Sequence, residues 1–202
     1  MKLYYSPAAC SLSPHIVLHE AGLKFDPVLV TLNNHQLKDG SNFYAYNPLG
    51  YVPLLELDNG TRLAEGPAIV QYIADQVPDK KLAPPNGSLA RYQLQSLLNF
   101  ITSELHKPMG ALFGKDLHED TRRATKERLA GRLHWLDGQL EGKQYAMGDT
   151  FSVADAYLFT VTNWGKMVGV DIAPYKHISA VCARIAARPA VQAAMKAEGL
   201  LT

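Results

Sequence analysis

The sequence predicts an α/β unit in the first part of the chain and an all-α unit in the rest. Before about residue 80, short β-like runs alternate with turn residues, whereas the later apolar residues follow the 3.6-residue period of helices. Residues 78–88 hold three prolines and a glycine, which cannot continue a helix and are typical of a linker. We therefore expect domains at residues 1–79 and 88–202, with a linker at 80–87.

The N-terminal unit is predicted to be a small layer of strands and helices. Gly22 is placed to end the first helix, and Asp58-Asn59-Gly60 is a strong signal for a hairpin between two strands. Pro67 fits the first turn of the helix that follows. The expected elements, in order, are strand 2–5, helix 11–21, strand 25–30, a helical turn at 42–46, strands 52–57 and 61–64, and helix 67–76.

The C-terminal unit is expected to begin with a long helix over residues 89–113. Its apolar residues share one face, and small polar residues with a histidine form a second stripe away from that face. Such a stripe fits a cleft or a subunit interface, and it also fits an ordinary solvated face. Ser152 and Asp155 form a capping-box pattern, which is a folding signal without chemistry. The other helices are expected at 119–140, after 152–155, at 178–187 and at 190–197.

The composition excludes several classes of protein. The 202 residues are 47% hydrophobic and 19% charged, with a formal net charge of +1, which fits a folded protein with a sizeable core and not a disordered chain. No basic excess indicates nucleic-acid binding, and no apolar run approaches the roughly 18 residues of a membrane span. Because there are two cysteines and no signal peptide, we expect a reduced, cytoplasmic protein. From the charge and the lack of a long apolar run, we expect that it binds neither nucleic acid nor membrane.

Cys10 is the first candidate for chemistry. It falls between the first strand and the first helix, where free backbone N–H groups and the helix dipole favour the reactive thiolate. Ser13 follows at the spacing of C-x-x-S, a one-thiol relative of the redox motif C-x-x-C. A lone cysteine is also often a small buried apolar residue, and this is our interpretation of Cys182 on a later helix.

Two further features lie in the same unit. Val52-Pro53 stands at a strand start, where a cis bond in a tight turn would expose the Val52 backbone to a passing peptide; an ordinary trans proline is the alternative. Glu65-Gly66-Pro67 opens a helix, so free N–H groups there would hold a carboxylate and Glu65 would hold an ammonium. Glu65 also suits a simple helix-start residue. These groups fit the α-amino-acid end of a small molecule.

Cys10, Pro53 and Glu65 fall at one edge of the predicted sheet, and here the chain resembles a known family. The resemblance is carried by the motifs YSPAACSLSPH (5–15), NPLGYVPL (47–54), EGPAI (65–69), NFITSELHK (99–107) and SVAD (152–155). Over essentially its whole length the chain is similar to the bacterial beta-class glutathione S-transferases. The resemblance implies a thioredoxin-like N-terminal domain, an all-helical C-terminal domain, a homodimer, and glutathione as co-substrate without a metal.

The resemblance also implies where glutathione would lie. Its sulfur would be near Cys10, and its cysteinyl unit would pair with the main chain of Val52 before a cis Pro53. Glu65 and residue 66 would hold the γ-glutamyl end, and Gly66 stands where serine is frequent in the family. His35 stands where a family lysine often meets the glycyl carboxylate. The helix that lines the site would supply, in part from the partner subunit, Asn99, Ser103, Glu104, Leu105 and His106.

The expected reaction is attack of the glutathione thiolate on an electrophilic carbon of a small apolar compound, which is a detoxifying conjugation. Cys10 and His106 are the catalytic candidates, and His106 would either donate to the sulfur or accept its proton. Tyr5 and Ser11 are lesser candidates, because other transferase classes bind the thiolate with a hydroxyl. An acceptor pocket is expected at an apolar stripe that also resembles core. Its walls would be Met109, Phe113, Tyr157 and Trp164.

Two other functions stay open. A mixed disulfide between Cys10 and glutathione would make the protein a thiol-disulfide oxidoreductase, a peroxidase or a reductive dehalogenase. A non-catalytic binding protein or scaffold would keep the same fold. Such a scaffold has no need of Cys10, Val52-Pro53 and Glu65, and their presence favours an enzyme.

Overall fold

The computed structural model describes residues 1–201, and its contacts divide the chain into two compact units. The first unit contains residues 1–82 together with the residues from Arg188 onward, and the second contains residues 83–187. The sequence-based division assigns the C-terminal residues to the helical domain instead. The difference arises because their contacts are with a helix of the first unit, and sequence periodicity carries no information about such distant contacts.

The first unit is built on a five-stranded mixed sheet with the strand order β3-β2-β1-β4-β5. Strand β1 runs parallel to β2 and antiparallel to β4, while β2–β3 and β4–β5 are antiparallel pairs. The strands are β1 (Lys2–Tyr5), β2 (Asp26–Thr31), β3 (Gln36–Leu37), β4 (Leu54–Glu56) and β5 (Arg62–Ala64). The predicted hairpin is confirmed as β4–β5. Strand β3 was not predicted, because two residues are too short to show an alternating pattern.

Helix α1 lies at the centre of the first unit. Eight of its ten residues are buried, and it packs against both α2 and α9. Gly22 ends α1 in the left-handed conformation with φ of 67°, as the sequence predicts. The helices of this unit are α1 (Leu12–Ala21), α2 (Gly66–Asp75) and α9 (Pro189–Ala197), with short 3₁₀ turns η1 (Phe43–Ala45) and η2 (Pro78–Lys80).

Two side-chain contacts hold α9 within the first unit. The side chain of Glu198 is fully buried; it accepts the Ala8 backbone N–H at 3.0 Å and pairs with His15 Nδ1 at 2.8 Å. At the other end of α9, Arg188 binds both carboxylate oxygens of Glu20, at 2.6 and 2.8 Å. Glu198 thereby holds the loop before Cys10 to α1, since Ala8 lies in that loop with a left-handed φ of 60°.

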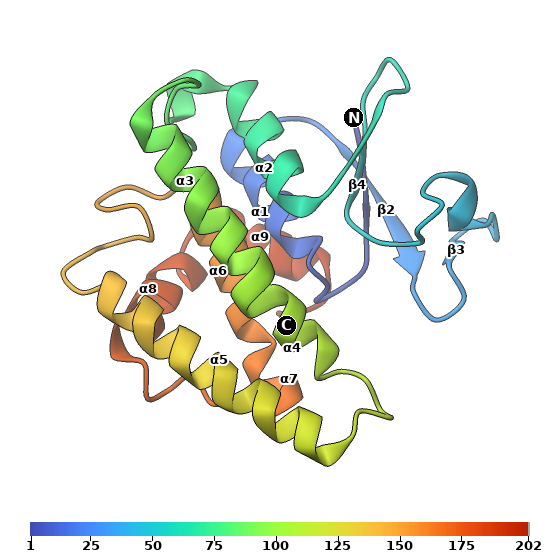
Figure 1. The fold of residues 1–202 in the computed structure, drawn as a ribbon. Coiled ribbons are helices and arrows are strands. Elements are labelled where there is room, and N and C mark those ends of the chain that lie inside the picture. The colour runs from blue at the N-terminus through green and yellow to red at the C-terminus, as the bar shows by residue number, and fades with distance from the viewer. Residues whose placement is uncertain (202) are drawn as a thin grey trace. The chain divides into compact units, whose positions relative to one another are not determined.

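The second unit is entirely helical, and its core is α6. Ten of the eleven residues of α6 are buried, because α3, α7, α8 and η3 all pack around it. Figure 1 shows α3 in green and α5 in yellow as the two long helices of this unit. The elements are α3 (Leu89–Phe100), η3 (Ile101–His106), α4 (Lys107–Ala111), α5 (Glu119–Gln139), α6 (Val153–Asn163), α7 (Gly165–Val168) and α8 (Lys176–Ala186).

The first turn of α6 is held by Asp155. Its carboxylate accepts the backbone N–H of Ser152 at 2.8 Å and that of Ala146 at 2.7 Å, and the Ser152 hydroxyl donates to it at 2.9 Å. The reach of Asp155 back to the residue before the helix confirms that part of the predicted capping box.

The predicted single α-helix over 89–113 is interrupted by the π-helical segment η3. The Lys107 N–H donates to the carbonyl of Thr102, five residues back. Pro108 accounts for the change, because it has no N–H and its ring crowds the carbonyl four residues earlier in a regular α-helix. Over residues 1–201, no helix combines the length and apolar character needed to cross a membrane.

Candidate active site

Cys10 and Val52 are in direct contact in the first unit. Cys10 lies in the turn between β1 and α1, partly exposed, and its thiol donates to the Val52 carbonyl oxygen at 3.2 Å. Val52 is buried, and its peptide bond to Pro53 is cis, as the family resemblance implies; the residues alone left a trans bond open. The thiol and the backbone of residue 52 therefore face each other at the end of neighbouring strands.

Glu65 and Gly66 lie at the start of α2. Glu65 has a left-handed φ of 67°, which is unusual for a residue with a side chain, and its exposed carboxylate makes no capping bond to the helix. A Cβ atom on Gly66 would come within 3.9 Å of the Pro53 ring, so the start of α2 is next to the cis proline. Backbone strain of this kind is concentrated at functional sites.

His35 is fixed by a contact that changes how it would meet a carboxylate. Its Nδ1 donates to the Gly50 carbonyl at 3.1 Å, and its ring lies on Tyr44 with a centroid separation of 4.6 Å. A neutral His35 therefore keeps only the lone pair of Nε2 for a ligand, and only the protonated ring donates to a carboxylate. Gly50 is required here, because a Cβ would meet the rings of His35 and Tyr44 at 2.7–3.0 Å.

The two hydroxyl candidates have other roles. The Ser11 hydroxyl is buried; it accepts the Ser6 N–H at 3.1 Å and donates to the Ser6 carbonyl at 3.2 Å, which closes the turn before α1. Tyr5 packs against His15 with ring centroids 5.4 Å apart. Burial, with the charge of Glu198, raises the pKa of Tyr5. Neither arrangement favours these hydroxyls as thiolate partners.

In the second unit, the residues predicted to bind glutathione lie in η3 and in the last turn of α3 before it. Asn99 and Ser103 are exposed, whereas the side chain of Leu105 is fully buried and has only its backbone to offer. Glu104 accepts from Arg132 at 2.6 Å and from Arg128 at 3.0 Å, both on α5. The hydrogen bond from Arg132, followed by that from Arg128, holds the pKa of Glu104 below its ordinary value.

His106 lies at the end of η3 among aromatic side chains. Its Nδ1 is 2.5 Å from the Tyr157 hydroxyl, and its ring meets Trp164 edge-on with centroids 4.9 Å apart. Burial, with a smaller contribution from the Lys107 charge, lowers the pKa of His106 to about 4. The ring is therefore neutral at physiological pH. The sequence did not predict the contact between His106 and Tyr157. It also did not single out Thr102, although Thr102 precedes His106 by four residues, a spacing that places the two on the same face of a helix.

The four expected walls of the acceptor pocket differ in exposure. Met109 and Tyr157 are almost completely buried, Trp164 is nearly so, and Phe113 is 48% exposed. Phe113 packs edge-on against Trp164 with centroids 5.8 Å apart. Phe113 and the edge of Trp164 are the surface that this group offers to a ligand, while Met109 and Tyr157 belong to the core of the unit.

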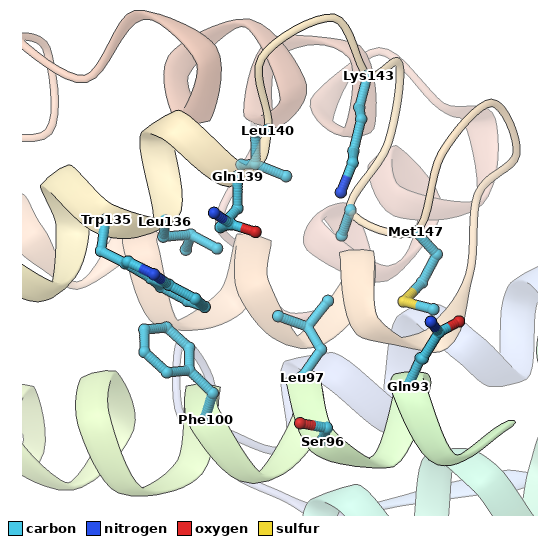
Figure 2. A pocket seen from close by; sticks show the side chains of 11 residues that line it. Gln93, Ser96, Leu97, Phe100, Trp135, Leu136, Gln139, Leu140, Lys143 and Met147 are labelled. Carbon is cyan, nitrogen blue, oxygen red and sulfur yellow. The ribbon is translucent and has the colours of Figure 1, made fainter. Parts of the chain in front are cut away.

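A separate cavity of about 330 Å³ opens between α3 and α5. Figure 2 shows the rings of Phe100 and Trp135 at one end and the Lys143 ammonium directed toward its interior. None of the predicted site residues lines it. Sequence reasoning did not find it, because its walls come from two helices and the loop after α5.

Cys182 lies elsewhere in the second unit, on α8. Its sulfur is 3.3 Å from the Thr162 hydroxyl, and burial raises the pKa of the thiol to about 11. This thiol is inert at neutral pH, in line with its interpretation as a core residue. Within residues 1–201, no group of three or more histidine, cysteine or acidic side chains is arranged to hold a metal ion.

Comparisons with known proteins agree with the fold and with the motifs. Residues 8–76 match the model of the glutathione S-transferase N-terminal domain, and residues 100–189 match that of the C-terminal domain. The glutathione S-transferase GstA of Escherichia coli O157:H7 is 44% identical over 200 residues, which cover 99% of this chain and 100% of that protein.

Two solved structures have the same fold over the full length of both chains. One is the bacterial beta-class glutathione S-transferase of Sphingomonas chungbukensis, and the other is a sphingomonad glutathione S-transferase complexed with glutathione. Each is 47% identical, with a TM-score of 0.95 and coverage of 100% of both chains. The thioredoxin-like and helical units, the cis Val52-Pro53 bond and these similarities lead to one conclusion: the chain belongs to the glutathione S-transferase family, and its resemblance to the bacterial beta class is confirmed.

Proposed function

We propose that the protein transfers glutathione to small apolar electrophiles, with Cys10 and His106 acting on the glutathione sulfur. The observation that carries this proposal is the contact between the Cys10 thiol and the Val52 carbonyl beside a cis proline. A carbonyl oxygen has two lone pairs, so Val52 can accept the amide of a bound peptide and the Cys10 thiol together. The general activity, glutathione transfer, is that of the family to which the chain belongs.

Each end of glutathione has a partner of suitable charge in the first unit. The exposed Glu65 carboxylate is available for the γ-glutamyl ammonium, and the N-terminus of α2 supports the adjacent carboxylate. His35 would meet the glycyl carboxylate through Nε2, because its Nδ1 is bonded to the Gly50 carbonyl. In the second unit, Asn99 and Ser103 are exposed and can contact the ligand. Glu104 would contribute to the site together with Arg132, which donates a hydrogen bond to its carboxylate.

The sulfur must become a thiolate before it attacks carbon. A free thiol has a pKa near 8.5, so a binding site that favours the anion raises the reactive fraction at neutral pH. The Cys10 thiol has one proton, which it would turn from the Val52 carbonyl to the glutathione sulfur, and the neutral His106 ring can take up a proton. The electrophile would lie against Phe113 and Trp164, which form an edge-on aromatic pair.

The proposal includes the predicted homodimer, in which part of the glutathione-binding residues of the second unit come from the partner subunit. It also includes a detoxifying role in the cytoplasm.

Thiol-disulfide exchange is the second candidate, and the exposure of Cys10 favours it. Cys10 is partly exposed, and Ser13 stands at the position of a second cysteine. Attack of the Cys10 thiolate on a glutathione mixed disulfide would form a Cys10–glutathione disulfide and release the other thiol. A second glutathione thiolate would then reduce it and leave as oxidised glutathione.

Two assays on the purified protein distinguish these functions. Conjugation is measured with glutathione and a chloro-nitroaromatic compound, and exchange with a mixed disulfide. We expect conjugation to dominate, whereas turnover of the disulfide alone would establish the second candidate. Glutathione binding without turnover of either substrate would identify a binding protein. Sedimentation at the assay concentration tests the homodimer.

The glutathione site is tested with Glu65→Gln. Charge-assisted hydrogen bonds contribute about 1.5–3 kcal/mol, so the dissociation constant of glutathione should rise roughly tenfold or more. Asp26→Asn, which removes an exposed carboxylate from β2 of the same unit, is the matched control and should bind as the wild type does. Unchanged calorimetric affinity in a folded Glu65→Gln variant would remove Glu65 from the site.

A further inference from the structure

A line of hydrogen-bonding groups leads to His106 through the interior of the second unit. The Thr102 hydroxyl donates to the Leu98 carbonyl at 2.8 Å and is 3.2 Å from the Tyr157 hydroxyl. The same Tyr157 hydroxyl is 2.5 Å from His106 Nδ1. The Tyr157 side chain is almost completely buried, whereas Thr102 and His106 are half-buried.

The number of protons on each group determines which atom donates in each of these hydrogen bonds. A threonine hydroxyl has one proton, and Thr102 donates its own to the Leu98 carbonyl, which has none to give. In the contact with Tyr157, Thr102 therefore acts as acceptor and Tyr157 as donor. The tyrosine hydroxyl also has one proton, which leaves its oxygen to accept from His106. Nδ1 of His106 must then carry a proton.

We propose that Thr102 and Tyr157 are positioning residues that hold His106 in the tautomer with the proton on Nδ1, so that Nε2 presents a lone pair. This inference rests on the proposed role of His106 at the glutathione sulfur, and it decides between the two roles that the sequence leaves open. A lone pair on Nε2 can receive the proton of a thiol, and it cannot donate to a thiolate. His106 is therefore a proton acceptor.

The proton transfer balances within this arrangement. The S–H bond of glutathione breaks, its electron pair stays on sulfur as the thiolate, and the proton forms a new N–H bond at Nε2. The ring becomes an imidazolium whose Nδ1–H still donates to the Tyr157 oxygen. The imidazolium then releases the Nε2 proton to water, which restores the neutral ring for the next cycle.

The other groups around the ring are consistent with a neutral base. Trp164 and Tyr157, from α6 and its end, are uncharged neighbours, and Lys107 is the adjacent cation on its own helix. Helix α5 packs against η3, and its two charged side chains there are both paired with Glu104; they are Arg128 and Arg132. Burial and the Lys107 charge together keep the resting ring neutral, so Nε2 carries no proton before the thiol binds, and the imidazolium formed by proton transfer is short-lived.

Nitrogen NMR of protein labelled with ¹⁵N-histidine tests the tautomer without any substrate. The spectrum distinguishes a proton-bearing nitrogen from an unprotonated one, and the His106 signals are identified by their loss in His106→Asn. We expect a proton on Nδ1 and none on Nε2. A ring with its proton on Nε2 in the wild-type protein would overturn the proposal.

Substitutions at Thr102 test whether Thr102 and Tyr157 fix the tautomer of His106. In Thr102→Val the Tyr157 hydroxyl loses the Thr102 oxygen as an acceptor and can donate to His106 Nδ1, so the Nε2-protonated tautomer should become populated and kcat should fall about tenfold, with little change in KM for glutathione. Thr102→Ser keeps the hydroxyl and should restore both properties. Thr160→Val is the matched control, because the Thr160 hydroxyl is buried and donates to the carbonyl four residues back, as that of Thr102 does.

Tyr157→Phe is a second test that does not depend on the folding of the Thr102 variants. It removes the oxygen that accepts from Nδ1, so the Nε2-protonated form should become populated and kcat should fall by a similar factor. A tautomer and kcat that do not change in Thr102→Val and Tyr157→Phe would overturn the proposal. If the tautomer is as inferred but His106→Asn keeps full kcat, the positioning by Thr102 and Tyr157 stands and the proposed role of His106 is wrong.

Discussion

The Cys10 thiol donates to the carbonyl oxygen of Val52 across 3.2 Å, which places the only partly exposed thiol of the first unit at the backbone where glutathione is proposed to pair. Cys10 can serve there as a covalent nucleophile or as a hydrogen-bond donor to the glutathione sulfur. The two roles predict different losses when the thiol is removed.

Cys10→Ala should abolish disulfide exchange and reduce conjugation only in part. Glutathione brings its own nucleophile, and the loss of one hydrogen bond to its sulfur would cost about 1–3 kcal/mol, or roughly 5- to 150-fold in rate. Both rates are measured, with ultraviolet titration of the bound thiolate. Cys182→Ala is the control and should keep both rates, because the pKa of that buried thiol is about 11. Full disulfide exchange in Cys10→Ala would exclude the covalent role.

Gly66→Ser should tighten glutathione binding severalfold. The new Cβ would be 3.9 Å from the Pro53 ring, an ordinary contact distance, and Gly66 does not need a left-handed backbone. A hydroxyl at the start of α2 can donate to the γ-glutamyl carboxylate, worth about 1 kcal/mol. Calorimetry compares this variant with Gly66→Ala, which fills the same space without the hydroxyl. If Gly66→Ser binds no more tightly than Gly66→Ala, the carboxylate does not lie beside residue 66.

Glu198→Ala should lower the free energy of unfolding by about 1–3 kcal/mol, because the buried His15 ring loses its hydrogen-bond partner and the Ala8 N–H loses the Glu198 acceptor. Urea denaturation measures the change. The comparison variant is Glu20→Ala, which breaks the ion pair with Arg188; that pair is partly exposed and should contribute about 1 kcal/mol or less. Equal losses in the two variants would contradict the role given to the buried pair.

The free energy of unfolding should also depend on pH through His106. Its pKa is about 4 in the folded protein and about 6.5 when unfolded, so between these values the unfolded chain binds more protons. Stability is therefore complete above pH 6.5 and falls as the pH drops to 4, by up to about 3 kcal/mol. The difference in stability between wild type and His106→Asn, measured by urea at several pH values, should follow this slope. A difference that is constant with pH would contradict the lowered pKa.

Much of the first unit could be predicted because its signals are local. The hairpin follows from Asp58-Asn59-Gly60 and the end of α1 from Gly22, and each signal lies within the element that it defines. The resemblance to a known family added the cis bond at Pro53, which composition and periodicity alone do not indicate.

What could not be predicted depends on contacts between residues distant in the sequence. The hydrogen-bond partner of His106 is Tyr157, 51 residues away, which the sequence suggested only as an apolar wall. The π-helical segment is a response to Pro108 that a fixed period of 100° per residue does not describe. The partner of His15 is Glu198, 183 residues away.

The place of α9 in the first unit has a consequence for the order in which the chain folds during synthesis. A ribosome releases residues 1–82 first, but their buried His15 and the Ala8 loop obtain Glu198 only after α9 has been made. The helical unit, residues 83–187, is contiguous and is complete earlier. The unit whose residues are translated first therefore cannot complete its buried contacts until the last residues of α9 have been made, although all residues of the helical unit have been synthesised by then.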